Sequence, residues 1–444
     1  MRAGPSPMCR HADVVIAGAG VTGLYLAYRI ASERPELSIV VLEASGRIGG
    51  RLRSLKRGGE HVLECGAEFI SDAQVNVFAL ASALHCRLIE TKFRRGGAYL
   101  RGRRDDEGYA LAPHEEKQSA SGLVLASLGA VAPEIAALLQ KGSNRVEDFE
   151  RLRGVVIDGR PLWAWSIGAL LRRTLSDEAF ALARATHGST AAFGQSNAFD
   201  ALVTQAIEAA PRQRFFRFEH GFESLASRLA QASPGVQLGL GHRVVSVRWQ
   251  PGGFRVRSAT AHGASEVRAR YVFLALPQAA LRRVRFSEDL ARSWCATELN
   301  AVSPVKAFKL FLEFERQWWN GEVGRLEPGE IAATFTDLPL QQIYFAGGQG
   351  ERSTLMAAFA DGDGAEYWQS FRVGPHNANL VADAPRAMID AAMRELRRIY
   401  PSAPDAIGGV FADWALGGWH AWKPGIKSWE SAARIHQPKS DAPL

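Results

Sequence analysis

The feature that most constrains this chain is a glycine-rich turn between an apolar run and a helical pattern near the N-terminus. Residues 13–17 read Asp-Val-Val-Ile-Ala, and residues 18–23 read Gly-Ala-Gly-Val-Thr-Gly. Residues 24–32 carry small and apolar side chains at helical spacing, and a second apolar run at 39–42 ends at Glu43. This order predicts a β-α-β unit of about 30 residues, the size of a dinucleotide-binding fold.

Each glycine of the turn has a physical reason to be there. Gly18 makes the turn, Gly20 lets the backbone approach a pyrophosphate, and Gly23 lets the helix lie close to the strand. The helix N-terminus favours negative charge. Glu43 can accept hydrogen bonds from both ribose hydroxyls, and it would repel the 2′-phosphate of NADP. The pattern therefore predicts a site for an ADP-containing cofactor.

A second glycine-rich motif follows directly, because residues 44–51 read Ala-Ser-Gly-Arg-Ile-Gly-Gly-Arg. The stretch L-E-A-x-x-R-x-G-G-R resembles the flavin amine oxidase family, which includes monoamine oxidases, polyamine oxidases and L-amino acid oxidases. Glycines here can bring the backbone against a diphosphate, which an arginine can neutralise bidentately. The resemblance implies non-covalent FAD, and in this motif it implies cofactor contacts from Ala44, Ser45, Gly49, Gly50 and Arg51.

The resemblance extends to weaker motifs further along the chain. Residues 64–70 read Glu-Cys-Gly-Ala-Glu-Phe-Ile, and in the family the Gly-Ala pair lies along the flavin ring, where a bulky side chain would collide. This places Gly66, Ala67, Glu68 and Phe69 at the flavin. Val244 is similar to a valine that contacts the adenine through its backbone, with Val245 as the alternative register. Residues 275–277 resemble the end of the strand that returns to the cofactor.

Lys309 is a candidate catalytic residue. In the family a lysine on a central strand holds a water against flavin N5 and precedes an aromatic pair by nine and ten residues, and Trp318 and Trp319 have this spacing. A charged group within an apolar strand needs a partner. The alternative is a solvent-facing strand lysine, and Lys306 is the second candidate.

The segment at residues 414–425, Trp-Ala-Leu-Gly-Gly-Trp-His-Ala-Trp-Lys-Pro-Gly, resembles the stretch that supplies the aromatic walls of the substrate cage. It gives Trp419, His420 and Trp422 as candidates to flank the reacting amine. The alternative is a packed cluster of tryptophans. Some members attach flavin through a cysteine in this region, where this chain has Trp419 or a neighbour, which favours non-covalent FAD.

The expected fold class is α/β, with a Rossmann-like FAD-binding domain and an inserted α+β substrate domain. We expect FAD-binding parts at 1–75 and 216–285, a mainly helical region without persistent strand alternation at 76–215, the substrate-domain sheet and helices at 286–405, and an incomplete return to the FAD domain at 406–444. Family members continue with a Gly-Glu-Ala turn and a glycine-rich helix. We therefore expect a truncated chain, a second polypeptide that supplies this element, or weak FAD binding.

The resemblance implies an FAD-dependent amine oxidase that converts an amine to an imine by hydride transfer to flavin N5, with O2 reduced to H2O2. The alternatives are an L-amino acid oxidase, a desaturase or porphyrinogen-type oxidase, and a non-catalytic FAD-binding subunit that needs a partner chain. Glu68 and Phe69 stand in place of the arginine by which typical L-amino acid oxidases hold the substrate carboxylate. This favours a substrate without an α-carboxylate.

Composition narrows the partners and the compartment. The chain has 444 residues, a net charge of +7 and four cysteines far apart in sequence. No basic tract is interleaved with aromatics and no apolar run approaches the ~20 residues of a membrane span, so we expect neither nucleic acid nor a membrane as partner. The cysteines suggest a reducing compartment, hence a cytoplasmic enzyme without a metal site or disulfides. The expected partners are a small amine or amino acid and O2, with a homo-oligomer or a complementing C-terminal chain left open.

Overall fold

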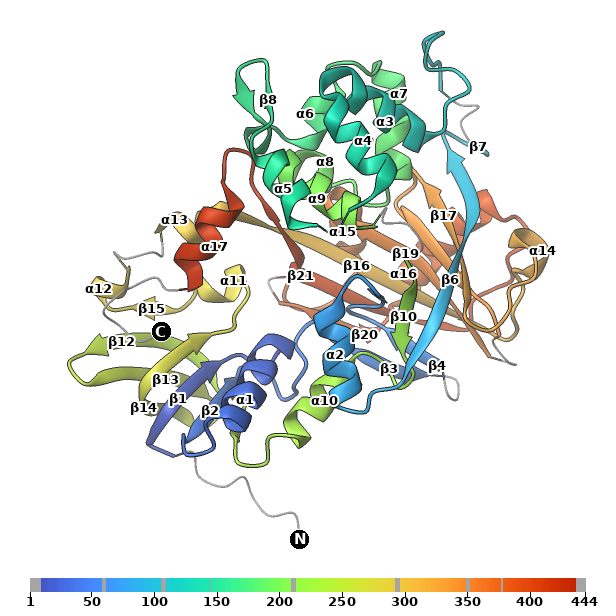
Figure 1. The fold of residues 1–444 in the computed structure, drawn as a ribbon. Helices are drawn as coiled ribbons and strands as arrows, with labels where there is room; N and C mark the ends of the chain where they lie inside the picture. Colours follow the sequence, from blue (N-terminus) through green and yellow to red (C-terminus); the bar gives the residue numbers. More distant parts are fainter. Residues whose placement is uncertain are drawn as a thin grey trace.

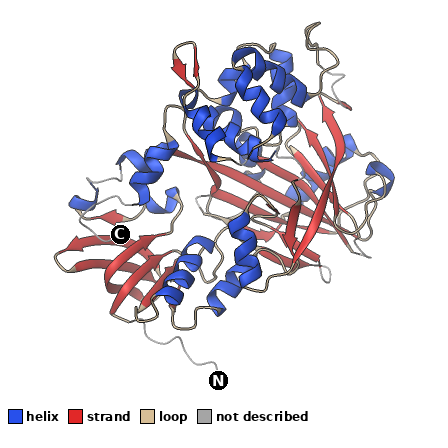
Figure 2. Cartoon of the chain, in the orientation of Figure 1, coloured by secondary structure: helices blue, strands red, loops and turns tan. Residues whose placement is uncertain are grey.

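The computed structural model describes residues 9–57, 61–104, 109–143, 145–208, 213–291, 296–348, 352–376 and 378–436. The chain forms two large sheets and a helical cap (Figure 1). The strands concentrate in the two sheets, and most of the helices lie in the cap or on the outer faces of the sheets (Figure 2).

The first sheet contains the predicted β-α-β unit and has the strand order β11-β2-β1-β14-β13-β12-β15. β1, β2, β11 and the last part of β14 run parallel, whereas β12, β13 and β14 form an antiparallel meander. The bounds are β1 His11–Ala17, β2 Ile39–Glu43, β11 Gln237–Leu240, β12 Arg243–Gln250, β13 Gly253–Thr260, β14 Gly263–Leu274 and β15 Arg285–Phe286.

The central strand of this sheet is apolar throughout because both of its faces are covered. Val14 and Ile16 pack toward α1 (Val21–Glu33) and α10 (Glu223–Gln231). Val15, on the opposite face, packs against the meander. A strand buried on both faces reads as a continuous apolar run rather than an alternating one. The predicted strand–turn–helix–strand order at the N-terminus is confirmed.

The second sheet has the order β20-β21-β16-β19-β18-β17-β6-β10-β5, with β7 paired to β6. Trp368 of α15 (Gly362–Gln369) and Leu396 of α16 (Arg386–Ile399) pack with Phe308 of β16 in the largest core. The strands are β5 Ile70–Ser71, β6 Leu88–Leu100, β7 Arg103–Arg104, β10 Phe215–Phe218, β16 Val302–Phe314, β17 Glu330–Thr336, β18 Gln342–Ala346, β19 Ser353–Asp361, β20 Leu380–Asp383 and β21 Gly408–Trp422.

The cap lies over one end of the second sheet (Figure 1) and has a hydrophobic core of its own. Its helices are α3 Ala120–Val131, α4 Pro133–Lys141, α5 Val146–Arg153, α6 Ile167–Leu171, α7 Asp177–Thr186, α8 Ala192–Gln195 and α9 Ala198–Glu208.

Short elements connect these bodies. The short strands and the helices α2 and α11 are β3 Ser54–Arg57, β4 His61–Glu64, β8 Val156–Ile157, β9 Arg160–Pro161, α2 Val75–Ala83 and α11 Gln278–Leu281. The remaining helices are η1 Leu162–Ala164, α12 Glu288–Leu290, α13 Ala296–Ala301, α14 Asn320–Val323 and α17 Ser428–His436. α17 lies beside α13, near the first sheet (Figure 1).

The prediction that residues 76–215 contain no persistent strand is wrong. β6 spans 13 residues and belongs to the second sheet, and the hairpin β8–β9 lies between cap helices. β6 contains several charged residues and the pair Gly96–Gly97, a composition typical of a loop. Its partners β17 and β10 are distant in sequence, so long-range pairing rather than local preference determines this strand.

Other predictions concern segments of different status. Cys9, Cys65 and Cys86 are free thiols, and Cys295 lies outside the described residues, as do residues 437–444. Among the residues placed by the structure, no helix is both long and apolar enough to cross a bilayer. Within that same part of the chain, no three His, Cys, Asp or Glu side chains cluster as metal ligands would.

Candidate cofactor and active site

The first glycine-rich turn is shaped by two glycines with different tasks. Gly18 has φ +104°, and a Cβ there would lie 2.5 Å from the Ala275 carbonyl oxygen. A Cβ on Gly23 would lie 2.0 Å from the Gly18 carbonyl oxygen. Gly23 therefore supports the turn from beneath, whereas Gly18 and Gly20 line a cavity. This division matches the tasks predicted for the three positions.

Glu43, at the end of β2, is held in place at the rim of this cavity. Its carboxylate accepts hydrogen bonds from the Ala19 N–H at 2.9 Å and from the Ser45 N–H and hydroxyl, each at 2.8 Å. These contacts fix the acidic side chain beside the glycine-rich turn before any ligand is present. Glu43, Ala44 and Ser45 all line the cavity.

The second glycine-rich motif lies directly beside the first. The Gly49 N–H donates to the Ala19 carbonyl at 2.8 Å, and a Cβ on Gly50 would lie 3.1 Å from the Gly20 Cα. Arg47 braces this loop, since its guanidinium donates to the carbonyls of Ile48, Gly50 and Leu52. Our sequence reading left Arg47 out of the site, although the motif L-E-A-x-x-R-x-G-G-R contains it.

Arg51 brings a positive charge to the cavity without a carboxylate to balance it. Its guanidinium donates to the Gly418 carbonyl at 2.9 Å, and within the described ranges it forms no ion pair. Burial lowers the pKa of Arg51 because the charged form loses hydration. A partly buried guanidinium with only a carbonyl partner is well suited to bind an anionic group.

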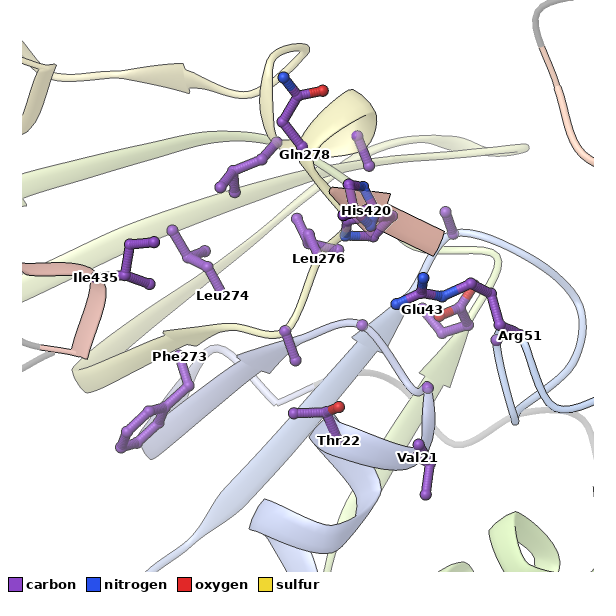
Figure 3. Close-up of a pocket in the computed structure, with 18 of the residues that line it drawn as sticks. Val21, Thr22, Glu43, Arg51, Phe273, Leu274, Leu276, Gln278, His420 and Ile435 are labelled. Atoms are coloured by element: carbon purple, nitrogen blue, oxygen red, sulfur yellow. The ribbon is translucent and has the colours of Figure 1, made fainter. Parts of the chain in front are cut away.

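The cavity has a volume of about 780 Å³, within the range of small-molecule and cofactor sites. Figure 3 shows Glu43, Arg51 and His420 gathered at one end, with Leu274 and Ile435 toward the other. The sequence reading missed several of the wall residues. The end of β14 and the turn after it contribute Val272, Phe273, Leu274, Ala275, Leu276, Pro277 and Gln278, and other elements contribute Val247, Asn379, Ile435 and His436.

The aromatic segment of β21 divides between two environments. Trp414, His420 and Trp422 line the cavity. Trp419 instead packs with Ala191 of the cap and Val305 of β16. The pairing of β21 with β16 shifts register between these positions, which places residues 415–418 in a bulge. The three aromatic candidates are therefore close in space, but only His420 and Trp422 face the cavity.

His420 is neutral at ordinary pH. Burial lowers the pKa of its imidazole to about 4, and the nearby Arg51 charge lowers it further. Its Nε2 is buried and has no hydrogen-bond partner among the described residues. Buried polar atoms are normally paired. An unpaired ring nitrogen at the cavity is consistent with a ligand that completes the site.

Lys309 and the loop at residues 64–69 lie behind the cavity wall rather than in it. The Lys309 ammonium donates to the Glu64 carbonyl at 3.0 Å, the Gly66 carbonyl at 2.9 Å and the Glu68 carboxylate at 2.8 Å. The Trp414 indole N–H donates to the Cys65 carbonyl at 2.7 Å. The loop is thus attached to the second sheet by two side chains.

The remaining candidates have the following positions. Phe69 packs edge-on against Phe93, with ring centroids 4.8 Å apart. Val244 is buried in the core beneath the meander, while Val247, three residues later, reaches the cavity. Gly66, Ala67, Glu68, Phe69, Val244, Lys309 and Trp419 do not line the cavity, and their proposed roles stay predictions.

The glycine cradle, the fixed carboxylate of Glu43, the unpaired guanidinium of Arg51 and the orphan nitrogen of His420 all fit a cofactor with a ribose and a diphosphate. The fold and this cavity define a Rossmann-type cofactor-binding protein. Residues 21–437 match the family model described as flavin containing amine oxidoreductase. The chain belongs to this family, whose members act on CH–NH or CH–NH2 groups and contain flavin. The resemblance and the fold class predicted from the sequence are confirmed.

Curated relatives include several L-amino acid oxidases. The mouse L-amino-acid oxidase is 27% identical over 379 residues, covering 79% of this chain and 54% of the mouse protein. Bordonein-L from Crotalus durissus terrificus is 25% identical, with 80% and 67% covered. Aplysianin-A from Aplysia kurodai is 25% identical, with 96% and 83% covered. The chain thus spans about half the length of the mouse relative.

Solved structures with the same fold include putrescine oxidases. Wild-type putrescine oxidase bound to putrescine has a TM-score of 0.64 and 19% identity, covering 96% of this chain and 91% of that one. A putrescine oxidase redesigned for cofactor binding has a TM-score of 0.66 and 20% identity, with the same coverage. These likenesses establish the fold.

Proposed function

We propose that this protein binds FAD non-covalently and oxidises the C–N bond of a small amine to an imine, with O2 as electron acceptor. The observation that carries the proposal is the buried, unpaired guanidinium of Arg51 in a glycine-lined cavity beside Glu43. Such a cavity offers neutralisation for a diphosphate and acceptors for a ribose. The family to which the chain belongs supplies the reaction class.

The residues would divide the work as follows. Glu43 would accept hydrogen bonds from the ribose, and the backbone of the two glycine loops would approach the diphosphate. Bound FAD would supply the chemistry by accepting a hydride equivalent from the α-carbon of the amine and passing electrons to O2. His420, held neutral, adds no positive charge that would repel a protonated amine on its way to the site.

The experiment is a spectroscopic and peroxide assay of the purified full chain. We expect a flavin absorption band that bleaches when an amine is added without oxygen, and H2O2 when oxygen returns. Flavin that binds but is not reduced by any amine would favour a non-catalytic FAD-binding subunit. Reduction by a non-amine substrate without reduction by amines would favour a desaturase or porphyrinogen-type oxidase. A colourless protein that takes up no FAD would refute the proposal.

A second candidate is oxidation of L-amino acids, which the names of the curated relatives favour. Glu68 argues against it, because a carboxylate would repel the carboxylate of an amino acid. The two candidates are separated with matched pairs, such as putrescine with ornithine and phenethylamine with phenylalanine. Faster flavin reduction by the decarboxylated member of each pair supports amine oxidation, and the opposite order supports an L-amino acid oxidase.

A further inference from the structure

The ammonium of Lys309 is fully committed to one short segment of the chain. A lysine ammonium has three N–H donors. Here they serve the Glu64 carbonyl, the Gly66 carbonyl and the Glu68 carboxylate, at 3.0, 2.9 and 2.8 Å. Its side chain is 5% exposed and that of Glu68 is 16% exposed. The contact is therefore a largely buried ion pair rather than a surface one.

A buried ammonium needs a counter-charge, because carbonyl partners alone do not offset the loss of hydration. Glu68 supplies that charge. The other titratable groups near the pair are Glu64 and Cys65, which sense the charge of Lys309, and Tyr344 of β18, which senses that of Glu68. The ring of Phe359 lies 5.1 Å from the ammonium and adds a weaker attraction.

The same segment is tied to the cofactor loop. The Cys65 N–H donates to the Arg53 carbonyl at 2.8 Å, and the Ala67 N–H donates to the Arg51 carbonyl at 3.2 Å. The backbone at Gly66 is so close to this loop that a Cβ there would lie 1.8 Å from the Arg51 carbonyl oxygen. A shift of residues 64–68 would therefore move the backbone that carries Arg51.

We propose that Glu68 is a positioning residue. Its carboxylate keeps the Lys309 ammonium on the segment 64–68, and this clamp, formed by Lys309, Glu68 and the carbonyls of Glu64 and Gly66, fixes the backbone behind the cofactor site. With all three donors engaged, Lys309 acts through the loop and not by presenting a water of its own. The claim that this backbone faces the flavin rests on the proposed function, whereas the clamp itself does not.

The test is amide hydrogen exchange of the full chain, with and without added FAD. Glu68→Ala and Lys309→Met should each speed exchange of the Cys65 and Ala67 amides by about tenfold or more, because local opening frees both hydrogen bonds. Adding Glu68→Ala to Lys309→Met should produce no further change if Glu68 acts through the lysine. Glu68→Gln keeps an acceptor without the charge, and should restore part of the protection.

Matched controls lie on the same strand. Lys306 pairs with Glu366 at the surface, 2.7 Å apart, with side chains 41% and 59% exposed. Lys306→Met and Glu366→Ala should leave exchange at Cys65 and Ala67 unchanged. Exchange in β1, remote from the clamp, should also be unchanged in every variant, which separates local opening from general loss of stability.

The flavin spectrum supplies a second measurement. If the chain binds FAD, Glu68→Ala should shift the flavin absorption band or its fluorescence, and Glu68→Gln should return it toward wild type. Unchanged exchange in Glu68→Ala, beside faster exchange in Lys309→Met, would overturn the role of Glu68. Unchanged exchange in both would overturn the clamp. Failure to bind FAD would refute the proposed function alone, since the exchange measurement does not need the cofactor.

Discussion

Two buried titratable side chains near the cavity are shifted toward their neutral forms. Burial raises the pKa of the Glu64 carboxyl to about 7, from an ordinary value of 4.5. Burial also lowers the pKa of His420 to about 4, from 6.5. Glu64 accepts hydrogen bonds from the Ser54 hydroxyl and the Phe222 N–H, both at 2.8 Å, so it joins the β3–β4 hairpin to the start of α10.

These opposite shifts predict opposite pH dependence of stability. Between pH 4.5 and 7 the folded protein keeps a proton on Glu64 that the unfolded chain releases, so stability is lost as pH rises. Between pH 6.5 and 4 the unfolded chain binds a proton on His420 that the folded protein does not, so stability is lost as pH falls. Where the two windows overlap, the slopes partly cancel.

We predict that single variants unmask each slope. Without FAD, Glu64→Gln should lose on the order of 1–2 kcal/mol of unfolding free energy, relative to wild type, as pH falls from 6.5 to 4.5. His420→Gln should instead gain relative stability over the same acidification. Urea unfolding at a series of pH values measures both. Parallel curves for the two variants would contradict the assigned shifts.

A second prediction concerns Gly66. A Cβ at this position would lie 1.8 Å from a backbone oxygen, which cannot move without shifting the Arg51 loop. Gly66→Ala should lower unfolding free energy by about 1–3 kcal/mol and reduce FAD retention. Gly46→Ala is the control, since no atom lies within 4 Å of a Cβ there. Equal flavin content after dialysis of both variants would refute the argument.

A third prediction concerns Glu43, which holds the first glycine turn and faces the cavity. Glu43→Ala should weaken FAD binding by about 10- to 100-fold, because charge-assisted hydrogen bonds are worth roughly 1.5–3 kcal/mol. Glu43→Gln keeps part of the hydrogen bonding to Ala19 and Ser45 and should lose less. Fluorescence titration of the purified chain with FAD gives the dissociation constant. An Ala variant with wild-type affinity would exclude Glu43 from the ribose site.

At the scale of elements, sequence was most informative where local pattern and tertiary contact agree. Strand β1, the turn at residues 18–23 and helix α1 follow from apolar runs and glycine spacing, because both faces of this strand are buried. The same holds for α16, predicted at residues 387–399 from its amphipathic pattern and observed at Arg386–Ile399.

Elements that depend on distant partners were less readable. Strand β6 carries charges and a Gly-Gly pair, and it forms because β17 and β10 pair with it. The facing of Trp419 and His420 depends on the bulge at residues 415–418, a feature set by the pairing of β21 with β16. Arg47 could have been chosen from its motif, whereas the contact of Lys309 with Glu68 spans 241 residues and has no local signal.

The attachment of the cap gives an element-scale prediction. Asp361, at the end of β19, is 4% exposed and accepts hydrogen bonds from Ser189, from the N–H and hydroxyl of Thr190 and from the Ala191 N–H. Asp361→Ala leaves buried donors unpaired and should cost about 2–4 kcal/mol. Limited proteolysis should then cut the cap faster. Asp363→Ala, at an exposed neighbouring position, is the control, and equal proteolysis of the two variants would contradict this anchoring role.

At the scale of the whole molecule, the two sheets meet at the segment 64–68. One side of this segment is bonded to the Arg51–Arg53 backbone of the cofactor loop, and the other to Lys309 of β16 and Trp414 of β21. The cavity is bounded by both bodies, because β14 and the glycine loops form one wall and β21 forms another. Cofactor affinity should therefore depend on how firmly the two bodies are joined.

Trp414→Phe tests this dependence. The indole N–H donates to the Cys65 carbonyl at 2.7 Å, and its removal leaves that carbonyl without the bond. We expect a loss of about 1–3 kcal/mol in unfolding free energy and a higher dissociation constant for FAD. Trp318→Phe is a matched control, because the buried Trp318 indole nitrogen has no partner in the described part of the chain, so losing it should be neutral or stabilising. If both variants bind FAD equally and unfold alike, the junction between the sheets does not govern the site.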